Sequence, residues 1–163
     1  MAHSRRADAP SERADGARFL IVEARYYETI GAMMLAGARA AFERAGASVE
    51  IVGVPGALEI APAMKIALDA AQEACSPYAG AVALGCVIRG ETYHFEIVSN
   101  ESARALTLLG LERGAALGNG VLTVENEDQA LERADPARGD KGGDAARAAL
   151  ALHALKRRLE TAR

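Results

Sequence analysis

The 163-residue sequence contains no tryptophan, and its aromatic residues are limited to three phenylalanines and four tyrosines. A core with this composition cannot depend on large aromatic side chains. Alanine is abundant instead, with 37 residues, and half of the chain is apolar by count. We therefore expect one core of ordinary size, in which helices and sheet approach each other closely over small side chains.

Other absences exclude whole classes of protein. The net charge is only -3, which gives no case for binding nucleic acid or an anionic membrane surface. No apolar run approaches the roughly 18 residues of a membrane span. The two cysteines, Cys75 and Cys86, cannot form a disulfide framework and lack the CxxC spacing of metal or redox sites. These absences predict a cytoplasmic protein in a reducing compartment, without a metal site.

The first 16 residues are polar and rich in small side chains, and they contain no apolar segment of the kind found in signal peptides. Their composition predicts a disordered tail over residues 1–16, followed by a single domain over residues 17–163. Within the tail, Arg5 and Arg6 are expected to be solvated, and contact with an acidic partner is the alternative.

Beyond the tail, short apolar runs alternate with longer helical patterns. The short runs predict four strands, over residues 18–24, 48–54, 80–88 and 117–125. Because these runs are apolar almost throughout, the strands are expected to be buried on both faces, as in a parallel sheet. The predicted fold is an α/β three-layer sandwich of the flavodoxin-like type, with a four-stranded parallel sheet and helices on both faces.

The longer patterns predict five helices. The first helix is expected to end near residue 46, and the second to cover residues 59–74. The third is expected to begin near residue 93. The last two are expected to cover residues 125–134 and 142–160. In the second helix, Pro62 is expected in the first turn, where proline is tolerated. The last pattern aligns four apolar side chains on one face: Ala148, Leu152, Leu155 and Leu159.

Parallel folds of this type bind ligands outside the carboxyl ends of the strands, and the third strand runs there into GCVIRGETYHFE, residues 85–96. Gly90 suits a tight turn, Thr92 is a good N-cap, and the free N–H groups of the helix start favour an anion such as phosphate. His94 follows in the first helical turn, and a histidine can exchange a proton near neutral pH. The alternative is an ordinary loop-to-helix junction with a surface histidine.

Two further segments follow the first and second strands. Pro55 and Gly56 predict a turn, after which Glu59 falls at a helix start that favours its negative charge. Glu59 either has this stabilising role or accepts hydrogen bonds from a polyhydroxyl ligand. Tyr26 and Tyr27, after the first strand, are either a stacking platform for a ring or ordinary exposed tyrosines.

Two cations follow the fourth strand. Arg133, on the predicted short helix, could hold a phosphate through two parallel hydrogen bonds, and the alternative is a solvated arginine. Lys141 lies in the glycine-containing segment beyond it. Cys86, inside an apolar strand, is expected to be a buried small hydrophobe rather than a nucleophile.

Four segments occur in an order and spacing that resembles the 6,7-dimethyl-8-ribityllumazine synthase family: VPGALEIA, GCVIRGETYHFE, GVLTVENEDQALERA and DKGGDAA. The resemblance covers nearly all of residues 17–160. It implies an enzyme of riboflavin biosynthesis that condenses 5-amino-6-(D-ribitylamino)uracil with 3,4-dihydroxy-2-butanone 4-phosphate. The products are 6,7-dimethyl-8-ribityllumazine, phosphate and water, and neither a metal nor a cofactor takes part.

The resemblance also implies roles for the residues at matching positions. Tyr26 stacks on the pyrimidine ring, and the backbone of Val87 and Ile88 reads the uracil edge. His94 transfers protons, and Lys141 lies near the pyrimidine. The other matches hold the ribityl chain, through Ala57 and Glu59, and the phosphate, through Gly90, Glu91, Thr92 and Arg133.

Two pocket positions depart from the family pattern. Leu58 stands where many members carry phenylalanine, and Asn119 stands where many carry an aromatic or other apolar residue that lines the pocket from the adjacent subunit. Both changes predict weaker substrate binding with the chemistry intact. In addition, EIAP replaces the commoner EIP and shifts Pro62 by one position.

The resemblance further implies a homo-oligomer. Family sites lie between the subunits of a pentamer, with Arg133 and the fourth-strand side supplied by the neighbour, and members can assemble further into capsids. The expected ligands are small-molecule substrates, with no nucleic acid and no membrane. Two alternatives to a working enzyme are a paralogue that binds a flavin or lumazine without turnover and a shell-forming protein.

Overall fold

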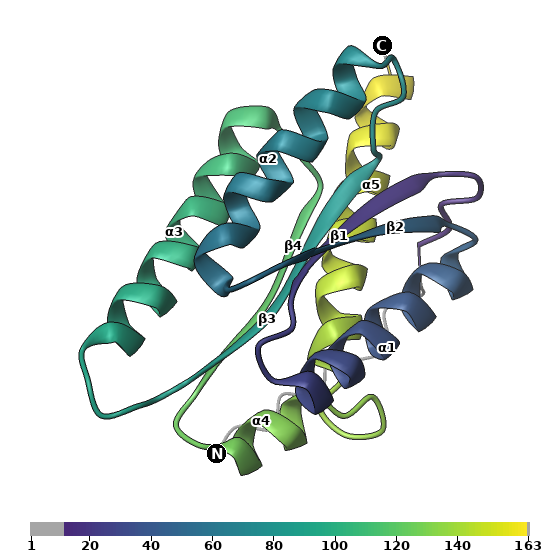
Figure 1. Cartoon of the computed structure of the whole chain (residues 1–163). Coiled ribbons are helices and arrows are strands. Elements are labelled where there is room, and N and C mark those ends of the chain that lie inside the picture. Colours follow the sequence, from purple (N-terminus) through teal and green to yellow (C-terminus); the bar gives the residue numbers. More distant parts are fainter. Residues whose placement is uncertain (1–11, 163) are drawn as a thin grey trace.

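A single sheet of four parallel strands forms the centre of the computed structural model, which describes residues 12–162. The strands lie in the order β2-β1-β3-β4, with β1 at Arg18–Ala24, β2 at Ser48–Val54, β3 at Gly80–Ile88 and β4 at Leu117–Val124 (Figure 1). These bounds agree with the predicted ranges to within one residue. The predicted parallel sheet is therefore confirmed.

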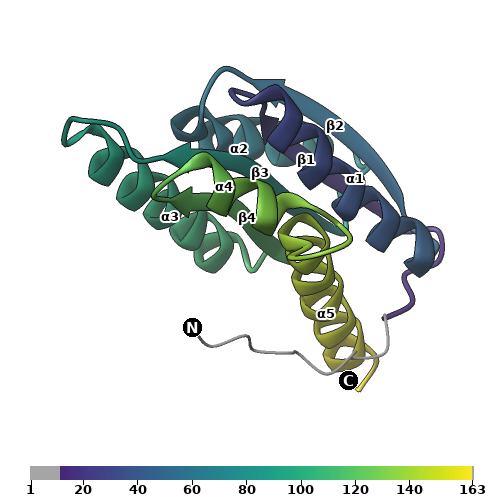
Figure 2. The same cartoon turned by 90° about the horizontal axis from the view of Figure 1, so that it is seen from below.

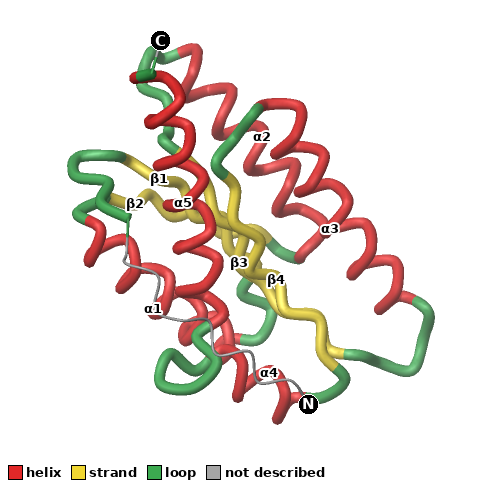
Figure 3. Tube along the Cα trace, turned by 180° about the vertical axis from the view of Figure 1, so that it is seen from behind, coloured by secondary structure: helices red, strands yellow, loops and turns green. Residues whose placement is uncertain are grey.

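Helices cover both faces of this sheet. On one face lie α1 (Glu28–Ala45), α4 (Glu127–Ala134) and α5 (Lys141–Thr161), and on the other lie α2 (Ala57–Glu73) and α3 (His94–Arg113) (Figures 1 and 2). Seen from behind, α5 lies over the sheet (Figure 3). The three-layer, flavodoxin-like sandwich is confirmed.

The sheet separates two clusters of buried side chains. In β1, Phe19 and Ile21 pack with α1 and α5, whereas Leu20 and Val22 pack with α2 and α3. Phe19 and Phe42 are in contact, with ring centroids 4.7 Å apart. Because both faces of the strand are buried, its sequence is apolar at every one of these positions rather than at alternate ones.

Small residues allow α5 to approach its neighbours at backbone distance. A Cβ atom at Gly118 of β4 would overlap the carbonyl oxygen of Ala145 in α5. A Cβ atom at Gly142 of α5 would overlap the carbonyl oxygen of Met34 in α1. The expectation of close packing over small side chains is met at these contacts.

The prediction for Pro62 was wrong. Helix α2 begins at Ala57, with Gly56 as its N-cap, so that Pro62 lies beyond the first turn. Proline removes the N–H group that would bond to the carbonyl four residues earlier. Pro62 is exposed, whereas Ile60 and Met64 on the opposite side of the helix are fully buried. Burial of that apolar face outweighs the lost hydrogen bond.

The apolar stripe expected in the terminal helix does not face the core. The buried residues of α5 all lie between Gly142 and Leu150. Leu152, Leu155 and Leu159 are between 41% and 59% exposed, because they line an open groove between α5 and α3.

Of the predicted tail, residues 1–11 lie outside the described part of the chain. The backbone N–H of Ala14 donates to the carbonyl oxygen of Ala45 over 2.8 Å, and that of Gly16 donates to Gly46 over 3.2 Å. Ala14 is buried, so this short segment packs against the end of α1. Within the described residues, no helix is both long and apolar enough to cross a membrane.

Candidate active site

A cavity of about 460 Å³ opens at the carboxyl ends of the strands. Its walls come from the loop after β1, the start of α2, the end of β3 and the start of α3. The lining residues are Tyr26, Tyr27, Gly56, Ala57, Leu58, Glu59, Cys86, Val87, Ile88, Gly90, Thr92, His94, Phe95 and Val98. This is the edge at which a parallel sheet of this type binds ligands.

The cavity brings together most of the residues that the sequence nominated. It contains His94 and all of the nominated residues from the ends of β1 and β3 and the start of α2. Four nominated residues do not line it: Glu91, Asn119, Arg133 and Lys141. The residues in the cavity come from four separate segments, which only the parallel topology makes adjacent.

The start of α3 forms one end of the cavity. Helix α3 begins at His94 with Tyr93 as its N-cap, and no side chain caps it, so the predicted capping role of Thr92 was wrong. The N–H group of Glu96 in the first turn donates to the carbonyl oxygen of Tyr93 over 3.1 Å. The N–H groups at the very start of a helix have no carbonyl one turn earlier and point toward its N-terminal end. This end can therefore bind an anion, with His94 beside it.

Gly90 contributes space rather than an unusual backbone conformation. Its φ lies outside the left-handed region, and a Cβ atom there would meet no atom within 4 Å. The turn therefore does not require glycine, contrary to the sequence interpretation. The missing side chain instead leaves open the part of the cavity beside the α3 terminus.

Two tyrosines form the rim at the end of β1. Tyr26 is 75% exposed, and its ring meets that of Tyr27 edge-on with centroids 5.1 Å apart. Tyr27 is half-buried, and this burial raises the pKa of its phenol above the usual value. Tyr27 therefore stays neutral and can donate a hydrogen bond, whereas the exposed ring of Tyr26 is free to stack.

Glu59 lies in the first turn of α2 and is exposed to the cavity. Its carboxylate lies close to the N-cap, since a Cβ atom at Gly56 would be 2.9 Å from Glu59 Oε2. This place suits both interpretations made from the sequence: the carboxylate interacts with the positive end of the helix dipole and can also accept hydrogen bonds from hydroxyl groups.

Four lining residues were not nominated as site residues: Gly56, Cys86, Phe95 and Val98. Cys86 is half-buried, and burial raises the pKa of its thiol to about 11, so it behaves as the small hydrophobe that was expected. Phe95 and Val98 belong to the apolar stripe of α3 that also includes Leu106. Both residues lie near the start of the helix and are only half-buried, whereas Leu106 on the same stripe is buried.

The nominated residues outside the cavity lie on other surfaces. Glu91 is exposed in the loop before α3. Asn119 is exposed on the edge strand β4 and lines a second, mainly apolar groove of about 550 Å³. That groove lies between α3 and the second half of α5, and Leu111, Leu152 and other leucines contribute to it.

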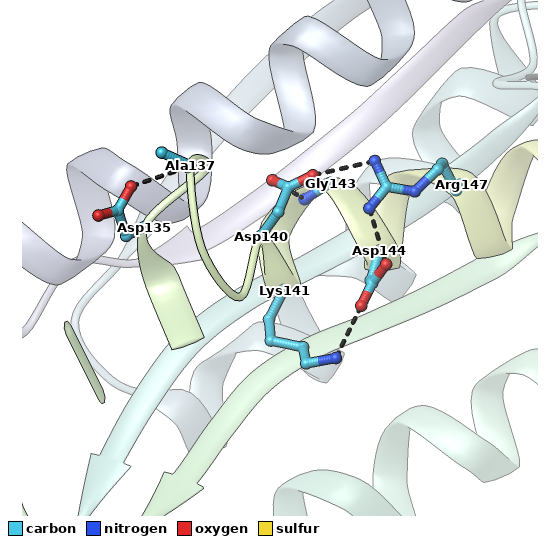
Figure 4. Close-up of polar contacts among 7 residues, drawn as sticks. All are labelled: Asp135, Ala137, Asp140, Lys141, Gly143, Asp144 and Arg147. Carbon is cyan, nitrogen blue, oxygen red and sulfur yellow. Dashed lines mark hydrogen bonds and ion pairs between the residues drawn. The ribbon is translucent and has the colours of Figure 1, made fainter. Parts of the chain in front are cut away.

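Arg133 and Lys141 have partners in their own segments. Arg133 is half-buried and donates from Nη1 to the carbonyl oxygen of Gln129 over 3.0 Å. Lys141 Nζ lies 2.8 Å from Asp144 Oδ2, and Arg147 contacts the other oxygen of this carboxylate at 2.7 Å (Figure 4). Burial raises the pKa of Asp144, but hydrogen bonds from Lys141 and Arg147 outweigh that effect and hold it below its usual range.

The chemistry that the cavity can support follows from its groups. It offers an exposed aromatic ring, a carboxylate, an anion-binding helix end and a histidine, together with the end of β3, whose pairing with β1 stops at Leu84. Among residues 12–162, no group of three or more histidine, cysteine or acidic side chains is placed to hold a metal ion. The arrangement suits a ligand with a planar ring, hydroxyl groups and a phosphate.

Comparisons with known proteins agree with this description. The family model described as 6,7-dimethyl-8-ribityllumazine synthase matches residues 16–157. A protein of that name from Methylocella silvestris is 70% identical over 147 residues, which are 90% of each chain. One from Azorhizobium caulinodans is 62% identical over 90% of this chain and 91% of its own. A third, 6,7-dimethyl-8-ribityllumazine synthase 1 from Rhodopseudomonas palustris, is 55% identical over 99% of this chain and all of its own.

Proposed function

Since the chain belongs to the 6,7-dimethyl-8-ribityllumazine synthase family, we propose that the cavity at the carboxyl ends of its strands is where the condensation takes place. The protein is a transferase of riboflavin biosynthesis. It joins 5-amino-6-(D-ribitylamino)uracil to 3,4-dihydroxy-2-butanone 4-phosphate, with release of phosphate and water. The observation that carries the proposal is that one cavity gathers an aromatic rim, a carboxylate, a helix N-terminus and His94.

The pyrimidine is proposed to bind on the β1 and α2 side of the cavity. Tyr26 stacks on the ring, and the backbone of Val87 and Ile88 bonds to the uracil edge. The ribityl hydroxyls lie against the start of α2, where Glu59 accepts their hydrogen bonds. Leu58 lines this side without an aromatic ring, so stacking there depends on Tyr26.

The phosphorylated ketone is proposed to bind at the start of α3. The phosphate lies against Gly90, Glu91 and Thr92, where the helix terminus favours negative charge. The same groups stabilise the phosphate as it leaves, because its charge increases when the C–O bond breaks. Closeness of the two reactants supplies much of the acceleration.

His94 is proposed to move protons in this reaction. The primary amine attacks the ketone, and the adduct loses water to form an imine. Phosphate is then eliminated, and the ribityl-bearing nitrogen closes the ring with loss of a second water. Each step needs a proton taken up or released, and His94 lines the same cavity as the residues proposed to bind the two substrates.

We further propose that the site is completed by a neighbouring subunit in a homopentamer. Asn119, Arg133 and Lys141 lie off the cavity of their own chain. In β4, Gly118 and Gly120 face α5, whereas Asn119 and Thr123 on the other face are exposed. A neighbour's β4 side placed over the cavity brings Arg133 to the phosphate. We also propose that residues 17–163 form a single domain and that the protein is cytoplasmic.

The test is an absorbance assay for lumazine formation from the two substrates. The wild-type protein is expected to turn over, and His94→Ala is expected to fold normally and lose roughly 10²- to 10⁴-fold in rate, the range for general acid–base catalysis. A wild-type protein that binds lumazine but forms none would instead indicate a binding paralogue. Turnover of His94→Ala at the wild-type rate would remove the histidine from the mechanism.

A further inference from the structure

Arg89 connects three elements around the proposed phosphate-binding end of the cavity. It follows the last residue of β3, and its backbone N–H donates to the carbonyl oxygen of Val124 in β4 over 2.9 Å. Its side chain does not line the cavity. The guanidinium instead points to two carboxylates and an aromatic ring.

The contacts of this guanidinium fix its position. Arg89 Nε donates to Glu125 Oε2 over 2.7 Å, and Nη1 donates to Glu96 in the first turn of α3. Its Cζ lies over the ring of Phe95, 4.1 Å from the centroid. One planar group therefore connects the end of β4 to the start of α3, and lies directly beside the loop formed by residues 90–93.

The 90–93 loop has little else to hold it. Gly90 has open space where a Cβ would lie, all four residues are exposed, and Tyr93 is 71% exposed. The start of α3 has no side-chain cap. The position of the first-turn N–H groups therefore depends on contacts made by residues that flank the loop.

The charge state of the network favours this role. The hydrogen bond from the Arg89 guanidinium is the main cause that holds the pKa of Glu96 below its usual range. The carboxylate stays ionised, and the pair persists at neutral pH. A lysine could not reproduce the network, because an ammonium lacks the planar fork that reaches two carboxylates while stacking on a ring.

We propose that Arg89 is a positioning residue, which through Glu125, Glu96 and Phe95 holds the 90–93 loop and the start of α3 in the geometry that binds the phosphate of the substrate. The inference rests on the proposed function of the cavity. Arg89 itself contacts neither substrate in this proposal, but it holds in place the loop and the helix start that bind the phosphate.

The test is a double-mutant cycle of Arg89→Ala and Glu125→Gln, read by steady-state kinetics for each substrate. Arg89→Ala is expected to lower kcat/KM for the phosphorylated ketone about 10- to 100-fold, since small displacements of binding groups have effects of this size. The KM for the pyrimidine amine is expected to change little. Glu125→Gln should show part of the loss, and the double variant should be no worse than Arg89→Ala alone. Arg89→Lys should recover only a fraction.

The matched control is Arg104→Ala, which removes an exposed arginine–glutamate pair from the same helix α3. It is expected to keep wild-type kinetics. Wild-type kinetics in Arg89→Ala, additive losses in the cycle, or equal rises of both KM values with a lowered melting temperature would each overturn the positioning role.

Calorimetric titration with inorganic phosphate separates this inference from the proposed function. If the wild-type protein forms no lumazine, the proposed function fails, but the role of Arg89 is still measured. Weaker phosphate binding in Arg89→Ala than in Arg104→Ala supports the positioning role, and equal binding overturns it.

Discussion

At the scale of single residues, the two cysteines differ in their surroundings. Cys75 is exposed, whereas Cys86 is half-buried in the wall of the cavity and burial raises the pKa of its thiol to about 11. Alkylation requires the thiolate. At pH 8 a thiol with this pKa is ionised only to about one part in a thousand.

Iodoacetamide at pH 8 is therefore expected to modify Cys75 and leave Cys86 intact. The Cys86 rate should rise steeply as the pH approaches 11, which peptide mass spectrometry can follow. Equal rates at pH 8 would contradict the raised pKa.

A second residue-scale prediction concerns Arg133. Substitution of Arg133 by alanine is expected to raise the KM for the phosphorylated ketone by roughly 10-fold or more, in line with about 1.5–3 kcal/mol for a hydrogen bond to a charged group. The KM for the pyrimidine amine should change far less, as measured by steady-state kinetics. The control is Arg138→Ala, which removes an exposed arginine paired with Asp135. Equal rises of both KM values would assign Arg133 a structural role instead.

At the scale of elements, glycine decides how closely α5 can pack. A Cβ atom at Gly142 would overlap the backbone of α1, whereas one at Gly110 in α3 would meet only a side-chain carbon at 3.8 Å. Gly142→Ala is therefore expected to destabilise the fold by about 1–3 kcal/mol, the usual cost of overpacking. Gly110→Ala should stabilise it by about 0.4–1 kcal/mol, because alanine restricts the unfolded chain. Urea denaturation of the two variants measures both, and a loss of similar size in each would refute the packing explanation.

His153 connects α5 to the sheet and makes this contact sensitive to pH. Its ring meets Phe19 edge-on with centroids 5.5 Å apart. Burial, reinforced by the nearby Arg157, lowers the pKa of His153 below its usual 6.5. The unfolded chain therefore binds a proton at His153 more readily than the folded chain does. Neutral His153 contributes fully to the free energy of unfolding above about pH 6.5, and this contribution is lost as the pH falls.

His153→Gln, which does not titrate, is expected to reduce the loss of stability on going from about pH 7 to pH 5. Urea midpoints at the two pH values provide the measurement. An unchanged pH dependence in the variant would show that His153 does not contribute.

At the scale of the whole molecule, the sequence predicted the sheet better than the limits of its helices. Strands buried on both faces produce continuous apolar runs, as in β3, and these are visible without any structure. The start of α2 was misplaced because burial of Ile60 and Met64 outweighs the effect of Pro62. Helical periodicity aligned the leucines of α5 on one face, and three of them line one groove, but periodicity does not show how far the sheet extends beneath a helix.

The site was predictable in part for the same reason. Residues such as Tyr26, Glu59 and His94 follow strands directly, so parallel topology alone brings them to one edge. Cys86, Phe95 and Val98 are apolar or weakly polar, so the sequence does not distinguish them from residues of the buried core. Residue chemistry alone left Arg133 as either a phosphate ligand or a solvated arginine, and the family resemblance supplied the specific roles of Arg133 and Lys141. No pattern within one chain indicates the surface that these two residues face.

The proposed pentamer leads to a prediction about mixtures. His94→Ala and Arg133→Ala subunits, each inactive or weakly active alone, are expected to regain part of the wild-type activity when refolded together. Recovery arises where an intact His94 meets an intact Arg133 across a heterologous contact. Light scattering should show that the mixed rings have the mass of five chains. Verified mixed rings without recovery would place the whole site within one chain.

The placement of the tyrosines has an optical consequence. In the absence of tryptophan, ultraviolet emission comes from four tyrosines. Tyr26 and Tyr27 lie on the rim of the cavity and Tyr93 caps the helix that bounds it, whereas Tyr78 lies under Arg18 at the amino end of the sheet. Three of the four tyrosines therefore lie on the cavity or at the start of the helix that bounds it, and only Tyr78 is remote from it. If the proposed substrates bind in this cavity, we expect the tyrosine emission of the wild-type chain to change on binding, so that occupancy can be followed without any label.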